Sequence, residues 1–294
     1  MPADYEIYTD MSADLPAEVA KREGIAFVPM SFTIGQKSET VERPQSESEL
    51  KAFYDAQRSG EPTHTTQISP YMYTQLFEPV LASGRSVLYI SLSSGLSSTY
   101  SSSLVAAEEL NEKFASKLVC VDSLAATAGM GMLIELAAKN RASGMSLEEN
   151  AKWLEENRLR IYHWFMVEDL MFLKKGGRIP ATTAIVGSAF SIKPILKVNP
   201  DGTLSAFGKK RGSRAAMNEL VELYAAHSAG GDSERIMILH SDDPEKAEYL
   251  RQRLLEKNPG ADISVMLLSP VIGAHVGPGM CAVVHLAPEG VSRD

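Results

Sequence analysis

Hydrophobic residues in the first half of the chain alternate between strand spacing and helix spacing. Short apolar runs that suit buried strands are followed by segments whose apolar residues return every three or four positions. Strands are predicted at residues 5–8, 25–32, 86–90 and 117–121, and helices at 14–23, 46–59, after Pro70, from Leu96, at 127–138 and at 147–159. Asp14, followed by Leu15-Pro16, is expected to cap the first helix. This order predicts an N-terminal α/β domain, residues 1–160, with a doubly wound parallel sheet and sites at the carboxyl ends of its strands.

The pattern changes near residue 160. Residues 162–167 predict a strand, residues 168–172 one helical turn, and residues 195–207 a hairpin around Asn199-Pro200-Asp201-Gly202. The remaining predicted elements are helices at 215–227 and 244–257 and strands at 236–240, 263–267 and 281–286. Hairpins mixed with helices predict a C-terminal α+β domain with a mixed sheet, residues 161–294.

Charge and cysteine content narrow the function classes. Of the 294 residues, 37 are acidic and 29 basic, and the formal net charge of -8 argues against nucleic acid or an anionic membrane as the main partner. Cys120 and Cys281 lie in apolar runs and are expected to be buried, reduced thiols that cannot form a zinc site by themselves. The chain shows no signal peptide and no apolar run of membrane-spanning length. We therefore expect a cytoplasmic protein without stable membrane insertion, metal or cofactor.

A serine- and glycine-rich segment follows the third predicted strand. Ser93, Ser94 and Gly95 stand between the strand and a predicted helix start. Unpaired N–H groups and the helix dipole favour an anion at such a place, serine hydroxyls add donors, and glycine lets an anion approach the backbone. The alternative is ordinary capping, with Ser97 as the N-cap. The segment predicts either a carboxylate site or a capped helix.

Three further polar residues lie near the ends of predicted elements. Asp10 ends the first strand and either binds a ligand or stabilises neighbouring loops. Thr65 and Thr66, in a polar loop before a helix, are additional hydroxyl donors.

The second half holds one unusual histidine and two basic turns. His275 stands in the glycine- and proline-rich stretch 271–279, where it is either structural or a donor to a carboxylate. Arg178 and Arg211 belong to basic clusters at 174–180 and 209–214. These clusters are either solvated turns, or bind a phosphorylated ligand or an acidic partner, because arginine suits bidentate contacts.

Five motifs occur in one order along the chain: Thr9-Asp10 with Asp14-Leu15-Pro16, Thr65-Thr66-Gln67, Ser93-Ser94-Gly95-Leu96-Ser97-Ser98-Thr99-Tyr100, Leu173-Lys174-Lys175-Gly176-Gly177-Arg178-Ile179, and Gly273-Ala274-His275-Val276-Gly277-Pro278-Gly279. Together they resemble the DegV family, whose members include the fatty-acid-binding subunit of bacterial fatty acid kinase. The resemblance covers nearly the whole chain. The chain departs from the usual pattern at Thr66, where serine is common, and at Met11-Ser12, where Ser-Thr is common.

The resemblance implies a DegV-like fold of two α/β domains with one acyl chain buried between or beneath them. It implies that the fatty acid carboxylate is bound by these residues: Thr65, Thr66, Ser93, Ser94, Gly95 and His275. It also implies that Arg178 and, less directly, Arg211 face a separate kinase that makes the acyl phosphate for phospholipid synthesis. Each methylene group buried from water contributes about 0.8 kcal/mol, so an apolar tunnel could bind a long acyl chain tightly.

Two other functions remain open at this point. One is a stand-alone lipid carrier or sensor that meets no kinase. The other is a hydrolase or transferase acting on a small carboxylate or phosphate ester, with a loop serine as nucleophile and His275 as base. Against the second stands the sequence itself, which contains neither a G-x-S-x-G nucleophile elbow nor a G-x-x-x-x-G-K-[ST] phosphate loop.

Overall fold

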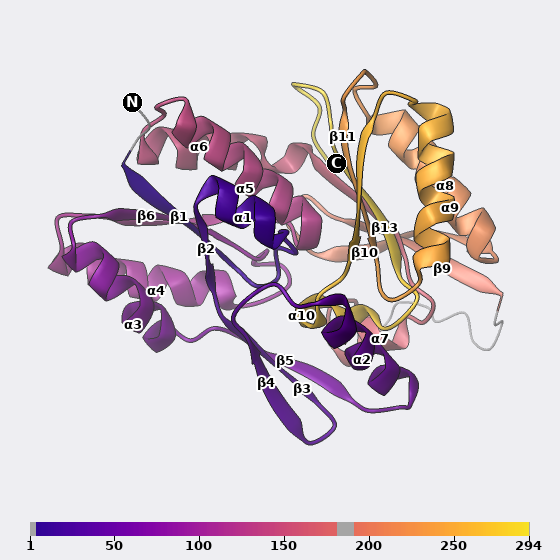
Figure 1. Ribbon diagram of the computed structural model, residues 1–294, viewed down its shortest axis with the longest axis horizontal. Helices are drawn as coiled ribbons and strands as arrows, with labels where there is room; N and C mark the ends of the chain where they lie inside the picture. The colour runs from indigo at the N-terminus through magenta and orange to yellow at the C-terminus, as the bar shows by residue number, and fades with distance from the viewer. Residues whose placement is uncertain (1–3, 181–190, 294) are drawn as a thin grey trace. The chain divides into compact units, whose positions relative to one another are not determined.

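The computed structural model describes residues 4–180 and 191–293, and the chain divides into two compact units (Figure 1). The first unit consists of three segments, which are the chain up to Ser31, Glu39–Pro44 and Thr65–Arg158. The second takes Phe32–Ser38, Gln45–His64 and the chain from Leu159 onward. The two early segments of the second unit are not distinguished by the hydrophobic pattern, which places the only boundary near residue 160.

The first unit contains a four-stranded sheet in the order β2-β1-β6-β7. The strands are β1 (Tyr5–Asp10), β2 (Ile25–Val28), β6 (Ser86–Ser91) and β7 (Leu118–Asp122), and every neighbouring pair is parallel. The predicted doubly wound parallel sheet is confirmed. The chain leaves β1 for β2 on one side and passes from β6 to β7 on the other, so the strand order reverses between β1 and β6. Ligands of open α/β sheets bind at the carboxyl ends of strands at such a reversal.

Helices cover both faces of this sheet, with α5 and α6 on one face and α3 and α4 on the other (Figure 1). The helices of the unit are α1 (Ala17–Glu23), α3 (Pro70–Ala82), α4 (Thr99–Lys113), α5 (Thr127–Ala142) and α6 (Leu147–Asn157). Local sequence sets their starts: Ser69 caps α3 with Pro70 in its first turn, and Ser146 forms a capping box with Glu149 at α6. The prediction for Asp14 is wrong, because α1 begins after Pro16 and Asp14 has a positive φ of 47°.

A small sheet in the order β4-β3-β5 is absent from the sequence prediction. It consists of β3 (Met30–Ile34), β4 (Lys37–Val41) and β5 (Thr63–Thr66). The predicted strand 25–32 is in fact two strands, since Pro29 has no N–H to continue the ladder. The helix α2 (Glu47–Arg58) lies where the apolar spacing predicted one, and it begins with a capping box between Ser46 and Glu49.

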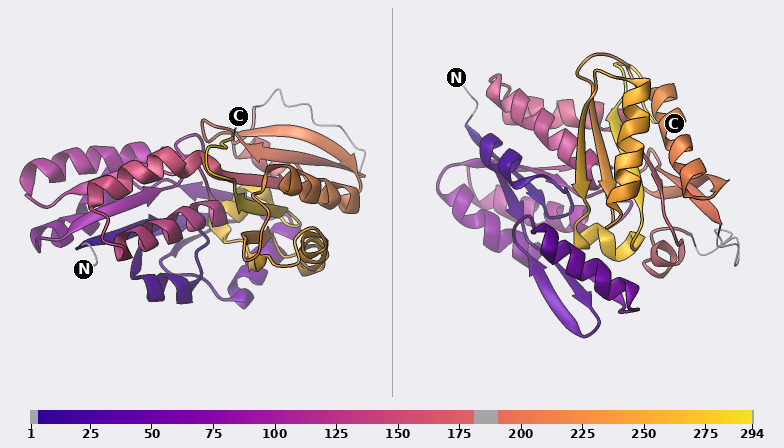
Figure 2. Two further views of the ribbon diagram at one scale, coloured as in Figure 1. Left: turned by 90° about the horizontal axis from the view of Figure 1, so that it is seen from above. Right: turned by 45° about the vertical axis from the view of Figure 1, so that its right-hand side comes forward.

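The second unit contains a six-stranded mixed sheet in the order β10-β9-β8-β13-β11-β12. Its strands are β8 (Ile161–Met166), β9 (Ile192–Val198), β10 (Leu204–Arg211), β11 (Arg235–His240), β12 (Asp262–Leu267) and β13 (Cys281–Leu286). Only the β11–β12 pair is parallel. Figure 2 shows α8 (Ser213–His227) and α9 (Pro244–Lys257) together along this sheet. The predicted C-terminal mixed sheet is confirmed, and short helices α7 (Met171–Lys175), α10 (Pro270–Val276) and the 3₁₀ turn Arg158–Arg160 complete the unit.

Side chains on the two faces of the six-stranded sheet are apolar. Tyr162, Trp164 and Met166 alternate along β8 and pack into the core that includes the buried side of α8 and α9. The intervening Phe165 is also buried, at 7% exposed, and points to the opposite face. A strand buried on both faces explains why 162–167 reads as a continuous apolar run.

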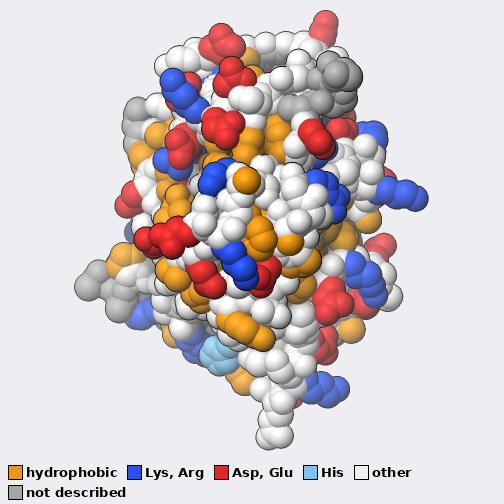
Figure 3. Space-filling model, turned by 90° about the vertical axis from the view of Figure 1, so that its left-hand side faces the viewer, with side chains coloured by type: hydrophobic (Ala, Val, Ile, Leu, Met, Phe, Trp, Pro, Cys, Tyr) orange, Lys and Arg blue, Asp and Glu red, His pale blue; other side chains and the backbone are white. Residues whose placement is uncertain are grey.

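The surface carries charged side chains of both signs. Figure 3 shows one face on which acidic and basic side chains are interspersed. Within residues 4–180 and 191–293, no helix is both long enough and apolar enough to cross a bilayer. Cys281 is buried and Cys120 half-buried, both are free thiols, and burial raises the pKa of each to about 12.

Candidate functional site

The β6–α4 loop lies at the reversal of strand order and is held from behind by two carboxylates. The backbone N–H of Leu92 donates to Asp10 Oδ2 at 2.9 Å, and that of Ser94 donates to Asp122 Oδ1 at 3.1 Å. Between them, the N–H of Ser93 donates to the Ala125 carbonyl at 3.0 Å. Asp10 and Asp122 end β1 and β7, the two parallel strands on either side of β6, so the ends of both flanking strands fix this loop. Asp122 is a loop-holding residue that sequence reasoning missed, and its place at the end of an apolar run is the signal that could have found it.

The loop also closes on itself around Ser93. The N–H of Gly95 donates to Ser93 Oγ at 3.1 Å, and the N–H groups of Leu96 and Ser97 donate to the Ser93 carbonyl at 3.0 and 3.2 Å. The predicted helix start at Leu96 is wrong, because α4 begins only at Thr99. The N–H groups of Gly95, Leu96 and Ser97 are used within the loop, so they are not the unpaired donors of a helix start.

The serines of the loop fall into two groups. Ser93 is fully buried, and Ser97 Oγ accepts from the N–H of Thr99 at 3.2 Å, which is a capping role close to the one the sequence suggested. Ser94 and Gly95 are exposed. Ser94 is therefore the serine of the predicted pair whose hydroxyl can meet a ligand directly, while Ser93 shapes the loop.

Asp10 is at the centre of a fully buried hydrogen-bond network. Besides Leu92, its carboxylate accepts from the N–H of Ser12 at 3.1 Å, from the Ser12 hydroxyl, and from Tyr89 OH at 2.9 Å. Tyr89 OH lies 2.6 Å from Tyr73 OH. Burial raises the pKa of Asp10, and the hydrogen bonds oppose that rise. Of the two roles considered for Asp10, the structure confirms stabilisation of the neighbouring loops.

Thr65 and Thr66 are the last two residues of strand β5, not part of a loop. Thr65 is half-buried and Thr66 exposed. Successive side chains of a strand point to opposite faces, so the two hydroxyls diverge. One carboxylate can be reached by one of them, not by both. Both threonines belong to the first unit, as do Ser93, Ser94 and Gly95.

His275 belongs to the second unit and lies in the last turn of α10, not in a loop. Pro270 occupies the first turn of this short helix, and Gly277 ends it. Two side chains from the early segments of the same unit hold its carbonyls: Gln57 Nε2 donates to Gly273 O at 3.1 Å, and Thr63 Oγ1 to Ala274 O at 2.9 Å. The two residues of α10 that precede His275 are thereby held in place.

The His275 ring lies against the basic glycine turn. A Cβ at Gly176 would come within 2.5 Å of His275 Nδ1, so only glycine leaves room for the ring. Burial, and then the charges of Arg178 and His64, lower the pKa of His275 to about 4. His275 is therefore neutral at pH 7 and offers an N–H donor, not a positive charge. Arg178 is half-buried, and burial lowers its pKa.

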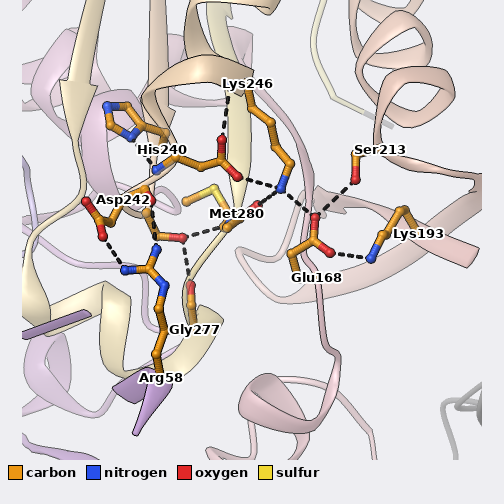
Figure 4. Close-up of polar contacts among 12 residues, drawn as sticks. Arg58, Glu168, Lys193, Ser213, His240, Asp242, Lys246, Gly277 and Met280 are labelled. Carbon is orange, nitrogen blue, oxygen red and sulfur yellow. Dashed lines mark hydrogen bonds and ion pairs between the residues drawn. The ribbon is translucent and has the colours of Figure 1, made fainter. Parts of the chain in front are cut away.

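A charged cluster around Glu168 holds the segment that follows α10 (Figure 4). Glu168 Oε1 lies 2.6 Å from Lys246 Nζ and 3.2 Å from Ser213 Oγ, and Glu168 also pairs with Lys193. The hydrogen bonds of both lysines lower the pKa of Glu168 against the effect of burial. Lys246 Nζ also donates to Gly279 O at 3.3 Å. This cluster ties three elements and the Gly279 turn together, and no local sequence pattern predicts it.

Arg211 lies in different surroundings from Arg178. It is exposed at the end of β10, where Ser191, Ile192, Lys209 and Lys210 join it around an open cavity of about 460 Å³. Lys210 pairs with Glu219 at 2.8 Å. Arg178 instead donates to the Gly176 carbonyl beside His275. The two arginines of the predicted docking set thus belong to one unit, one next to the histidine and one on an exposed basic strand.

Comparison with known proteins covers almost the full chain. A family model described as "Uncharacterised protein, DegV family" matches residues 4–287. A DegV domain-containing protein of Clostridium perfringens is 38% identical over 96% of this chain and 97% of its own. Another, from Lactococcus lactis, is 36% identical over 96% of this chain and 98% of its own.

Solved structures agree with this match. A DegV family protein from Thermus thermophilus, described for its fatty acid binding, superposes with a TM-score of 0.86 at 28% identity, over 97% of this chain and all of its own. DegV of Bacillus subtilis, described as a fatty acid binding protein, gives a TM-score of 0.82 at 27% identity over 97% of this chain and all of its own.

Proposed function

This chain belongs to the DegV family, and we propose that it binds a long-chain fatty acid and presents the carboxylate to a separate fatty acid kinase. The observation that carries the ligand class is the full-length similarity to solved DegV proteins described as binding fatty acids. The proposed protein is a lipid-binding subunit without catalysis of its own. In this proposal the protein binds the fatty acid, and the separate kinase forms the acyl phosphate.

The position of the carboxylate is supported by the geometry of the β6–α4 loop. The exposed Ser94 hydroxyl stands at the reversal of strand order, on a backbone that Asp10 and Asp122 immobilise. Fixed hydroxyl donors satisfy a carboxylate that would otherwise lie unpaired at the mouth of an apolar site. We assign Ser94, one of Thr65 and Thr66, and the neutral His275 as donors, with Gly95 allowing close approach and Ser93 setting the loop.

The acyl chain requires an apolar surface, and the six-stranded sheet supports one. Its face opposite to α8 and α9 carries buried apolar side chains at alternate strand positions: Phe165, Leu196, Met237, Leu239, Ala282 and Val284. Each methylene buried contributes about 0.8 kcal/mol, so a long chain along such a face binds tightly. We propose that this second face holds part of the acyl chain.

The first experiment is denaturing solvent extraction of the purified protein, followed by mass spectrometry. We expect about one long-chain fatty acid per chain, because a closed apolar site retains its ligand through purification. Ser94→Ala and His275→Ala should each retain less fatty acid after delipidation and reloading, since each removes a carboxylate donor worth about 1–3 kcal/mol. Ser101→Ala is the matched control, because Ser101 is exposed on α4 and its hydroxyl bonds the Ser98 carbonyl.

A blank extract that persists after incubation with mixed fatty acids would remove the proposed function. If fatty acid is retained equally by the parent protein, Ser94→Ala and His275→Ala, the ligand class stands and the assignment of carboxylate donors fails.

Charge reversal separates the kinase-coupled function from a stand-alone carrier. Arg178→Glu and Arg211→Glu should each lower kinase-dependent acyl phosphate formation by about tenfold or more, since an arginine contact with an acidic or phosphorylated group is charge-assisted. Arg211→Glu, on the exposed end of β10, should leave fatty acid content unchanged. The measurement is acyl phosphate produced by the purified kinase with lipid-loaded protein. Arg253→Glu, a partly exposed position on α9 of the same unit, is the control. Equal rates for all three variants would leave a lipid carrier without this docking surface.

A further inference from the structure

A second, smaller cavity lies in the second unit, at the edge of the sheet where β8, β9 and β10 meet the end of α8. Its volume is about 180 Å³. It is lined by Tyr162, His163, Trp164, Lys197, Val198, Phe207, His227 and Arg293. None of these residues belongs to the proposed carboxylate site or to the docking arginines.

Three aromatic rings and an imidazole form the walls. The Trp164 and Phe207 ring centroids lie 5.2 Å apart, edge to face, and the His227 ring lies 5.0 Å from Tyr162 and 5.1 Å from Trp164. Lys197 Nζ is 5.9 Å from the Phe207 centroid. Rings in these arrangements attract each other and a flat apolar body placed among them.

A β-bulge positions the side chain that forms the outer wall of the cavity. The β9–β10 register shifts between Ala206 and Gly208, so Phe207 is the extra residue of a β-bulge. Bulges re-aim a side chain and are common next to binding sites. Phe207 is 48% exposed although it is a large apolar residue, which leaves one side of the cavity open to solvent.

The polar groups of the lining are mainly hydrogen-bond donors. Trp164 is 3% exposed, and its indole Nε1 is buried without a hydrogen-bond partner among the residues that the structure describes. Lys197 and Arg293 add two cationic side chains. The Tyr162 hydroxyl is already used, donating to Ser292 O at 2.8 Å. Asp201, whose pKa is lowered by Thr203 and in small part by Arg293, is outside the lining.

We propose that this cavity binds a small aromatic carboxylate. The ring would lie against Tyr162, Trp164 and Phe207, and the carboxylate would pair with the cationic side chains of Lys197 and Arg293. Pockets for drug-sized molecules measure about 300–1,000 Å³, so this smaller cavity suits a single ring and not a long acyl chain. The site is separate from the proposed fatty acid function and goes beyond it.

The test uses the full chain with benzoate as the probe. The chain has two tryptophans, so Trp153→Phe leaves Trp164 as the only indole reporter. We expect benzoate to change Trp164 fluorescence saturably, and benzyl alcohol, which has the same ring without the charge, to bind at least about tenfold more weakly. Lys197→Gln should weaken benzoate by about tenfold, whereas Lys209→Gln on β10 should not. Thermal unfolding by circular dichroism checks that each variant is folded.

Absence of a saturable signal, equal binding of benzyl alcohol, or equal loss in Lys197→Gln and Lys209→Gln would each overturn the proposal. Competition between benzoate and a long-chain fatty acid would also overturn it, since the cavity would then be an extension of the acyl site. Arg293→Gln provides a second variant at the rim and should also weaken benzoate.

Discussion

Replacing Asp10 with alanine is expected to lower the free energy of unfolding by about 3–5 kcal/mol, among the largest effects of any single change in the first unit. Asp10 is fully buried, and its removal leaves the N–H groups of Leu92 and Ser12 and the hydroxyl of Tyr89 without their acceptor. Each buried donor left unsatisfied costs about 1–3 kcal/mol. Urea unfolding followed by circular dichroism measures the loss.

A second variant, Asp10→Asn, tests how much of this loss depends on the acceptor oxygens. Asparagine keeps one oxygen acceptor and the size of the side chain, so Asp10→Asn should cost less than alanine, about 1–2 kcal/mol. The exposed Asp55→Ala is the control and should change stability by less than about 1 kcal/mol. Because Leu92 precedes the serine loop, Asp10→Ala protein that still folds should also retain less fatty acid. An unfolding midpoint equal to that of Asp55→Ala would show that the network contributes little.

The sequence predicts best those strands and helices that contain many apolar residues. The parallel strands β1, β6 and β7 and the first half of α5 are largely buried all round and stand out as apolar runs, whereas α8 and α9 bury one face and show apolar residues at helical spacing. Strand β4 fails this test because four of its five residues are exposed, and β5 because it reads Thr-His-Thr-Thr. Such strands are specified by pairing with distant partners, which no local pattern records.

The candidate site was predictable as a set of residue types and less so as geometry. Serine and glycine at the end of β6 indicated a loop at the carboxyl edge of the sheet, and the structure places it there. The sequence could not tell Ser93 from Ser94, since one is buried and one exposed only through the fold. It also could not show that Asp122, nearly thirty positions away, would take the Ser94 N–H.

The local sequence could not predict the position of His275 either. Its glycine-rich neighbourhood suggested a loop, yet Gly273 and Ala274 lie inside α10 because side chains from Gln57 and Thr63 hold their carbonyls. The glycines serve close packing: at Gly273 a Cβ would meet Tyr54 OH at 2.5 Å, and at Gly176 it would meet the His275 ring. Long-range contacts, not local propensity, therefore set the position of the imidazole.

Gly277→Ala is expected to lower the free energy of unfolding by about 2–4 kcal/mol and to reduce fatty acid retention with it. Gly277 has a φ of 72°, a region that alanine enters only with strain, and its Cβ would come within 2.4 Å of the Phe172 ring. Its N–H closes α10 on Gly273 O at 3.0 Å, and its carbonyl accepts from Ser241 Oγ at 2.7 Å. A shift at this residue therefore moves the last turn, which carries His275.

Two controls separate the causes of that loss. Gly290 has a φ of 77° and nothing within 4 Å of a Cβ, so Gly290→Ala measures backbone strain alone, about 1 kcal/mol. The excess at Gly277 then combines its ψ of 177°, which with a positive φ is open essentially to glycine alone, with the collision with Phe172. A Gly277→Ala/Phe172→Ala double variant should recover the part due to the collision, giving a non-additive cycle. Equal losses at Gly277 and Gly290 would mean that Phe172 moves aside freely. Fatty acid retention unchanged in a folded Gly277→Ala protein would separate the end of α10 from the carboxylate site, and with it the proposed role of His275.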